Sequence, residues 1–168
     1  YACPIMAGIV TCLWQAFPEI KNMDLIEGIR KSSDKYATPD DRIGYGIPDM
    51  KNAFVSFMKQ LHTQSASLPS CVAIISGSVK VSEGMSMALE RKLPSDTTYL
   101  PVQIFTASGS FANNLFNCFD TLANFTSGVS VQYRLKINIG TDTSFYLDST
   151  TLFYASQCTT VTERKLCP

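Results

Sequence analysis

The spacing of apolar residues changes near residue 62, and this change limits the chain to a fold built from two kinds of element. Up to residue 61 the apolar residues recur at helical spacing, whereas after residue 70 they alternate with polar residues. The segment between them, residues 62–70, is small and polar and contains a proline, which predicts a linker. The sequence therefore predicts an α+β chain, helical over residues 1–61 and β over residues 71–168.

The first predicted helix, residues 2–17, is apolar on nearly every side. A helix of this kind is normally buried on every side. Pro4 fits the first turn, where a backbone amide needs no partner, and Pro18 marks the end. Three helices in about sixty residues bury too little surface to enclose such a helix. We therefore expect this part to pack against something much larger, as a fragment of a domain would.

Two further helices are predicted in the first part. One covers residues 24–32, with Asp24 as N-cap and an inward face of Leu25, Ile26 and Ile29. The other begins at Asp49, with apolar residues at helical spacing: Met50, Ala53, Phe54, Phe57, Met58 and Leu61. The intervening Gly44-Tyr45-Gly46-Ile47-Pro48 reads as a turn.

The second part predicts an antiparallel β-sandwich. Residues 129–139 alternate strictly between apolar and polar side chains, which indicates a half-buried strand. Gly140-Thr141-Asp142 then predicts a hairpin turn into a strand over residues 144–155. Weaker strand candidates are residues 71–78, 85–93, 99–106 and 115–119. Six or seven short strands in about a hundred residues are typical of a sandwich.

Charge and cysteine content narrow the classes of partner and compartment. Residues 1–61 and 62–168 each hold seven basic and seven acidic residues, so nothing favours nucleic acid or an anionic membrane. No apolar run has the length of a membrane span. Cys3 and Cys12 would lie on the order of 13 Å apart along one helix, too far for a mutual disulfide, and we expect them to be buried. Three pairings remain open for the other four: Cys71, Cys118, Cys158 and Cys167.

The opening residues Tyr1-Ala2-Cys3-Pro4-Ile5-Met6-Ala7-Gly8 resemble the motif that follows the nucleophilic serine of subtilisin-like serine proteases. The residues in register are Ala2, Pro4, Ala7 and Gly8, and the serine would be the residue before Tyr1. The order that follows is also similar. It runs from Trp14-Gln15-Ala16-Phe17-Pro18 through a short helix to Gly44-Tyr45-Gly46 and a closing helix with Ala53. The likeness covers about residues 1–61, the C-terminal end of such a catalytic domain.

The second part resembles the fibronectin type III-like sandwiches that follow protease domains in secreted proteins of Bacteroidetes-type bacteria. The stretches that carry this likeness are residues 89–93 and 131–136. Together the two resemblances imply the C-terminal fragment of a secreted or cell-surface endopeptidase, with a domain boundary at the linker.

The protease resemblance implies a Ser-His-Asp triad and an oxyanion hole, but it assigns no catalytic residue within this chain. It implies a supporting role for the motif residues, which are Tyr1, Ala2, Cys3, Pro4, Ala7 and Gly8. The chain alone is therefore expected to be inactive. Its implied partner is the missing N-terminal part of the catalytic domain, and a homodimer through the exposed helical segment is the alternative.

Other candidate residues favour ordinary structural roles. His62, the single histidine, is expected to be a surface residue of the linker, and Asp40-Asp41 a solvated turn rather than a calcium site. The sequence contains no Cys-x-x-Cys pair of the kind that binds zinc, and neither a metal nor a cofactor is predicted. Tyr146 and Tyr154 could contact a carbohydrate or a protein, although cross-strand packing is the commoner use. The alternative to the protease-fragment hypothesis is that the sandwich serves as a binding or spacer module for a surface, substrate or sorting partner.

Overall fold

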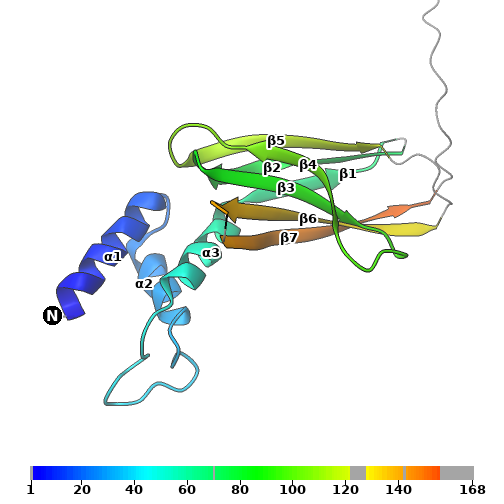
Figure 1. The fold of residues 1–168 in the computed structure, drawn as a ribbon. Helices are drawn as coiled ribbons and strands as arrows, with labels where there is room; N and C mark the ends of the chain where they lie inside the picture. The colour runs from blue at the N-terminus through cyan, green and yellow to red at the C-terminus, as the bar shows by residue number, and fades with distance from the viewer. Residues whose placement is uncertain (1, 70, 122–127, 142, 156–168) are drawn as a thin grey trace, which may run out of the picture. The chain divides into compact units, whose positions relative to one another are not determined.

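The computed structural model describes residues 2–69, 71–121, 128–141 and 143–155. Within these residues the chain is α+β, with three helices followed by seven strands in two antiparallel sheets (Figure 1). The chain separates into two compact units, Tyr1–Leu61 and His62–Pro168. We call them the helical unit and the β unit and describe each by itself.

The helical unit consists of α1 (Ala2–Ala16), α2 (Asn22–Lys31) and α3 (Met50–Leu61). Its small core is mostly aliphatic and contains an aromatic cluster, in which the ring centroid of Phe17 lies 5.2 Å from that of Phe54 and 5.7 Å from that of Phe57. Helices α2 and α3 approach closely at Gly28, where an added Cβ would collide with the Phe57 ring. A glycine is therefore needed there for packing, at some cost in helix propensity.

The start of α2 differs from the prediction. The helix begins at Asn22 with Lys21 in the N-cap position, and no side chain caps it. Asp24 lies inside the first turn, where its negative charge favours the positive end of the helix dipole. Leu25 and Ile29 are buried as expected, but Ile26 is exposed.

The β unit contains two sheets. One sheet has the order β1-β2-β5 and the other the order β4-β3-β6-β7, and all pairings are antiparallel. Strand β6 has the bounds that its alternation predicts. The strands are β1 (Thr63–Ser67), β2 (Val72–Val81), β3 (Met85–Lys92), β4 (Leu100–Thr106), β5 (Ala112–Thr121), β6 (Val129–Ile139) and β7 (Thr143–Tyr154).

The prediction of a linker over residues 62–70 is wrong for most of that segment. Thr63–Ser67 form β1, which pairs with β2 along its whole length. Its side chains are mostly small and polar, so the alternation is hard to see in the sequence. In the structure Gln64 and Ala66 are half-buried, whereas Thr63, Ser65 and Ser67 are exposed. The close approach of the two strands requires Gly77, because a Cβ there would collide with the carbonyl oxygen of Thr63.

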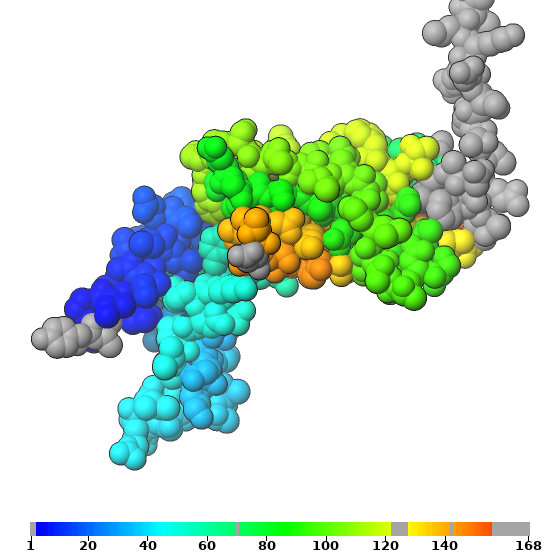
Figure 2. Space-filling view, viewed as in Figure 1, coloured from blue at the N-terminus to red at the C-terminus, as the bar shows by residue number. Residues whose placement is uncertain are grey.

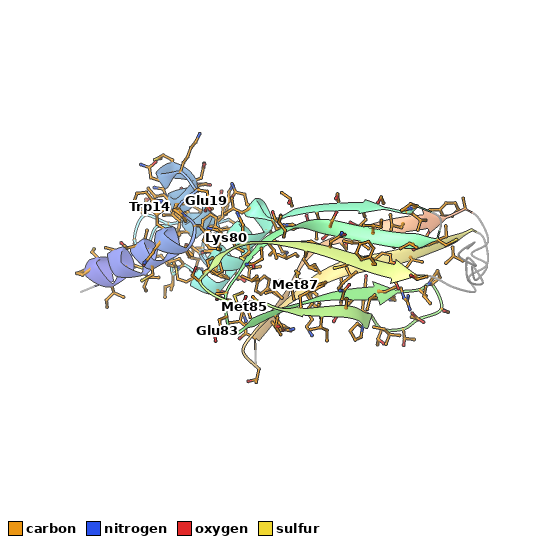
Figure 3. The ribbon with its side chains drawn as sticks, turned by 90° about the horizontal axis from the view of Figure 1, so that it is seen from above. Trp14, Glu19, Lys80, Glu83, Met85 and Met87 are labelled. Carbon is orange, nitrogen blue, oxygen red and sulfur yellow. The ribbon has the colours of Figure 1, made fainter. Side chains whose placement is uncertain are left out.

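The two sheets face each other across a shared core. Side chains from both are fully buried, among them Ile75 and Val79 of β2 and Leu89 of β3. Met85 and Met87 of β3 are buried as well (Figure 3). A hydrogen bond of 2.9 Å from Gln64 Nε2 to Thr150 Oγ1 joins β1 to β7, and therefore one sheet to the other.

The cysteines correct two expectations. Cys3 and Cys12 are free and exposed rather than buried. Cys118 of β5 is free and buried. All three pairings that the sequence left open are therefore excluded, because each of them uses Cys118. Cys71 is disulfide-bonded, whereas Cys158 and Cys167 lie outside the described residues.

Candidate functional site

The motif residues of the sequence analysis lie at the beginning of α1. Tyr1 is outside the described residues, and the helix begins at Ala2 with Pro4 in its first turn, as predicted. Cys3, Pro4 and Ala7 are exposed, and apart from the adjoining residues of the helix itself no atom lies within 4 Å of the position that a Cβ on Gly8 would occupy. The small side chains of this segment therefore leave open space beside the helix.

Most of the apolar surface of α1 is exposed. Ile5 is 62% exposed and Trp14 48% exposed, while Leu13 is buried. Figure 2 shows the surface of this helix in dark blue, and Figure 3 shows Trp14 on it. This exposure agrees with the expectation that three helices in about sixty residues bury too little surface to enclose such a helix.

The N-terminus of α1 has the electrostatic character of an anion-binding end. The first backbone amides of a helix have no acceptor within the helix, and the aligned peptide dipoles place partial positive charge there. No acidic side chain lies in the first turn of α1 to neutralise this charge. A group just before the helix would therefore be close to uncompensated amides, which stabilise negative charge.

The Gly44-Tyr45-Gly46 turn requires both of its glycines. Gly44 and Gly46 have positive φ angles of 59° and 80°, which glycine adopts without strain. The Oδ1 atom of Asp34 accepts a 2.8 Å hydrogen bond from the amide of Ile47, and a Cβ on Gly46 would collide with it. This turn positions the chain for α3, and we assign it a structural role.

The Asp40-Asp41 pair is a turn, as the sequence analysis expects. Oδ1 of Asp40 accepts hydrogen bonds from the amides of Arg42 and Ile43, at 2.8 and 2.9 Å. In the part of the chain that the structure describes, no three His, Cys, Asp or Glu side chains gather in a way that could hold a metal ion.

His62 is not the surface residue that the sequence analysis predicts. Its side chain is only 3% exposed, and its Nε2 atom lies 3.5 Å from Oδ2 of Asp148 on β7. The burial follows from the position of His62 directly before β1, which is a strand of the sheet rather than a linker.

The core of the β unit contains a polar cluster that the sequence analysis missed. Asp120 of β5 is buried and accepts hydrogen bonds of 2.8 and 2.9 Å from Nη1 of Arg91 and of 2.8 Å from the hydroxyl of Tyr133. The hydroxyls of Tyr133 and Tyr154 are 3.1 Å apart. Burial, the Tyr154 hydroxyl and the nearby Asp120 carboxylate all raise the pKa of Tyr133. Both tyrosines are therefore neutral donors or acceptors at physiological pH.

The outer face of the four-stranded sheet carries a second cluster. The guanidinium of Arg134 lies 3.7 Å from the ring centroid of Tyr99 and 3.8 Å from that of Tyr146. Its Nε atom donates a 2.7 Å hydrogen bond to the buried Glu90. Tyr146 packs against Arg134 but remains 41% exposed, whereas Tyr154 is buried, so of these two tyrosines only Tyr146 could make the outward contact that the sequence analysis considers. A nearby hollow of about 310 Å³ is lined by Lys92, Leu93, Pro94, Asp96, Ser130 and Gln132.

Comparison with known proteins gives little guidance. No protein family and no curated protein matches the chain. Among solved structures, the chain is similar to the sensor domain of the anti-sigma factor RsgI4 of Pseudobacteroides cellulosolvens, with 16% identity and a TM-score of 0.41. The match covers 61% of this chain and 96% of that one. A likeness this distant supports no inference about function.

None of the described helices has the length and apolar character needed to cross a bilayer.

Proposed function

We propose that residues 1–61 are the C-terminal helices of a subtilisin-like serine endopeptidase domain, and that the β unit is a fibronectin type III-like sandwich attached to it. The observation that carries the proposal is the state of α1. A helix that is apolar on nearly every side has most of its surface exposed, and it carries the protease-like motif in its first two turns. Such a helix is stable in water only when other chain segments cover it.

The chemistry of the family gives α1 a specific task. A serine in the motif register, one residue before Tyr1, would stand at the positive end of the helix dipole. There it would attack the peptide carbonyl after His removes its proton, and backbone amides would stabilise the oxyanion. Ala7 and Gly8 would allow neighbouring strands of the catalytic domain to approach the helix. The residues of this chain would support the reaction without supplying a catalytic side chain.

The topology of the β unit supports the second half of the proposal. In a constant-type immunoglobulin sandwich the fourth strand joins the sheet of the first, second and fifth strands. Here β4 instead pairs with β3, in the sheet that also contains β6 and β7. This strand order supports a fibronectin type III-like sandwich over a constant-type immunoglobulin one. The disulfide at Cys71 favours an oxidising compartment, and hence secretion or display at the cell surface.

An active-site serine probe tests the catalytic assignment. The natural protein, captured with an antibody against the β unit, should be labelled by a fluorophosphonate, either in the same polypeptide or in a companion that copurifies with it. The 168-residue chain expressed alone should take no label and hydrolyse no casein. Natural protein with the mass of this chain alone and no label would refute the proposal.

A pair of leucine substitutions makes the test specific to α1. Gly8→Leu in the natural protein should abolish labelling, because the side chain would fill space that we assign to neighbouring strands. Lys51→Leu adds the same side chain on the exposed side of α3 and should leave labelling intact. In the isolated chain Gly8→Leu should be tolerated, since nothing lies within 4 Å. Full labelling of the natural Gly8→Leu variant would contradict the assignment.

The β unit itself supports a second role, as a binding or spacer module, because it has its own core. Fully buried side chains from both sheets, such as Ile75 and Leu135, form that core within the unit. A pull-down with the intact chain and with a chain shortened to residues 1–61 separates the two possibilities. A target retained only by the intact chain indicates a binding module, and no target indicates a spacer.

A further inference from the structure

The four edge strands of the β unit differ in how they are protected against pairing with other chains. Natural proteins block sheet edges with short strands, prolines, bulges or charges. Strand β1 has only five residues, and β4 carries Pro101 and faces an irregularity in β3 after Leu89. Strand β7 carries Asp148 and pairs with β6 through a register shift.

Strand β5 has neither a proline nor a bulge, and its single charge, Asp120, lies near one end and points into the core. It is ten residues long, and its register with β2 is unbroken from Ala112 to Thr121. From Ala112 to Phe119 it contains no charged residue and no proline. Within the described residues it pairs only with β2, so its other edge is available (Figure 1).

The outer side of β5 also exposes large apolar side chains. Leu115 is 88% exposed and Phe119 is 53% exposed, and both point away from the core. They alternate along the strand with Asn113, Asn117 and Thr121. An exposed edge with an apolar stripe is typical of a strand that pairs with another strand.

The order of polar and apolar residues in β5 is symmetric about Asn117. On the outer side, Leu115 and Phe119 lie two residues to either side of Asn117, followed by Asn113 and Thr121. The inner side repeats the pattern, with Phe116 and Cys118 next to the centre and Asn114 and Asp120 beyond them. An antiparallel copy centred on Asn117 would therefore place an apolar residue opposite an apolar one and a polar residue opposite a polar one.

We propose that β5 pairs with β5 of a second copy of this chain, antiparallel and with the two-fold axis at Asn117. The symmetry of the sequence favours a second copy over an unrelated strand, because a two-fold interface uses the same patch on both subunits. The absence of charge over Ala112–Phe119 also means that the copies do not repel each other at this edge. The proposal depends on the β unit alone and is independent of the protease assignment.

Sedimentation equilibrium of the 168-residue chain tests this interface. One strand from each copy buries less than the roughly 1,200 Å² of a standard interface, so we expect a reversible dimer with a dissociation constant of about micromolar order. The weight-average mass should rise with concentration from 18.5 kDa toward twice that value. A mass that stays at 18.5 kDa over about a hundredfold range around that constant would overturn the proposal.

Charge substitutions identify the surface that is used. Leu115→Arg should raise the dissociation constant at least about tenfold, because it places a charge opposite Phe119 of the second copy. Ile104→Arg adds the same charge at an exposed position of β4 and should leave the constant unchanged. Both positions are exposed, so circular dichroism should show an intact fold for each variant.

The exposed helix α1 offers a competing route to association, and Ile9→Arg tests it. If Ile9→Arg abolishes the dimer and Leu115→Arg does not, association runs through α1 and the proposal is wrong. A chain that remains monomeric but binds an extended segment of another protein at β5 would likewise refute pairing with a second copy.

Discussion

The polar cluster in the β unit yields the sharpest prediction about stability. Asp120→Ala removes a carboxylate that accepts hydrogen bonds from Arg91 Nη1 and from the Tyr133 hydroxyl, at 2.8 to 2.9 Å. Its partners would remain in place, with Tyr133 fully buried and Arg91 largely so. Removing one member of a buried ion pair costs about 3–5 kcal/mol. Because Arg91 can still reach water, we expect the lower end, about 3 kcal/mol.

A loss of that size is a large fraction of the roughly 5–15 kcal/mol that stabilises a typical domain. Urea unfolding followed by the far-ultraviolet circular dichroism of the sheets is the appropriate assay. Trp14 is the single tryptophan and belongs to the helical unit, so its fluorescence does not report directly on the β unit. Asp120→Ala should lower the free energy of unfolding of the β unit and leave the Trp14 transition in place.

A double-mutant cycle with Arg91→Met isolates the contribution of the pair. The double variant should be more stable than the sum of the two single losses predicts, with a coupling energy of about 1–3 kcal/mol. The exposed pair of Glu27 and Lys31, 3.9 Å apart on α2, serves as the control and should couple by less than about 0.5 kcal/mol. A loss below about 1 kcal/mol for Asp120→Ala, or no coupling to Arg91, would refute the reasoning.

Three further predictions follow from packing and from the cysteines. Gly28→Ala should destabilise the helical unit by about 1–3 kcal/mol in a Trp14 fluorescence melt, because the new methyl collides with the Phe57 ring; equal or greater stability would contradict the packing. Burial raises the pKa of the Cys118 thiol from its ordinary 9.0 to about 11, so the folded state holds this proton more tightly than the unfolded state. The stability that this thiol contributes is complete below pH 9 and falls by about 1.4 kcal/mol per pH unit as the pH rises toward 11. In urea titrations Cys118→Ala should remove this contribution to the dependence of the free energy of unfolding on pH. Iodoacetamide should modify Cys3 and Cys12 rapidly in the isolated chain and leave Cys118 unmodified, as mass spectrometry of tryptic peptides would show.

The sequence predicted those strands whose alternation is strong. Val129–Ile139 was predicted with the bounds that β6 has, because its inward residues are large and apolar and its outward residues are polar. Strand β1 was missed, because hydroxyl-bearing residues fill its outer positions and only a glutamine and an alanine face inward. Pairing with β2 and the close approach at Gly77 determine this strand, and neither is visible in its own residues.

The polar clusters were beyond prediction for a different reason. Arg91 and Asp120 are separated by 29 positions and meet only when β3 of one sheet faces β5 of the other. Arg134 likewise meets Tyr99 and Tyr146 through the order of strands in the sheet and its register. A residue's type suggests which partners it can accept, whereas the topology decides which partner is present.

The exposed apolar surfaces of the two units have different geometry, and so they imply different partners. On α1 the apolar side chains surround the helix, and the backbone groups between its two ends are already paired within it, so only an envelope of packed side chains can cover the apolar surface. On β5 the apolar residues lie on one side of a strand whose edge still offers backbone donors and acceptors. A strand satisfies that edge and covers Leu115 and Phe119 at the same time, which a helix cannot do. The surface of α1 would therefore be covered only by a partner that encloses the helix, whereas one added strand would be enough to cover the edge of β5.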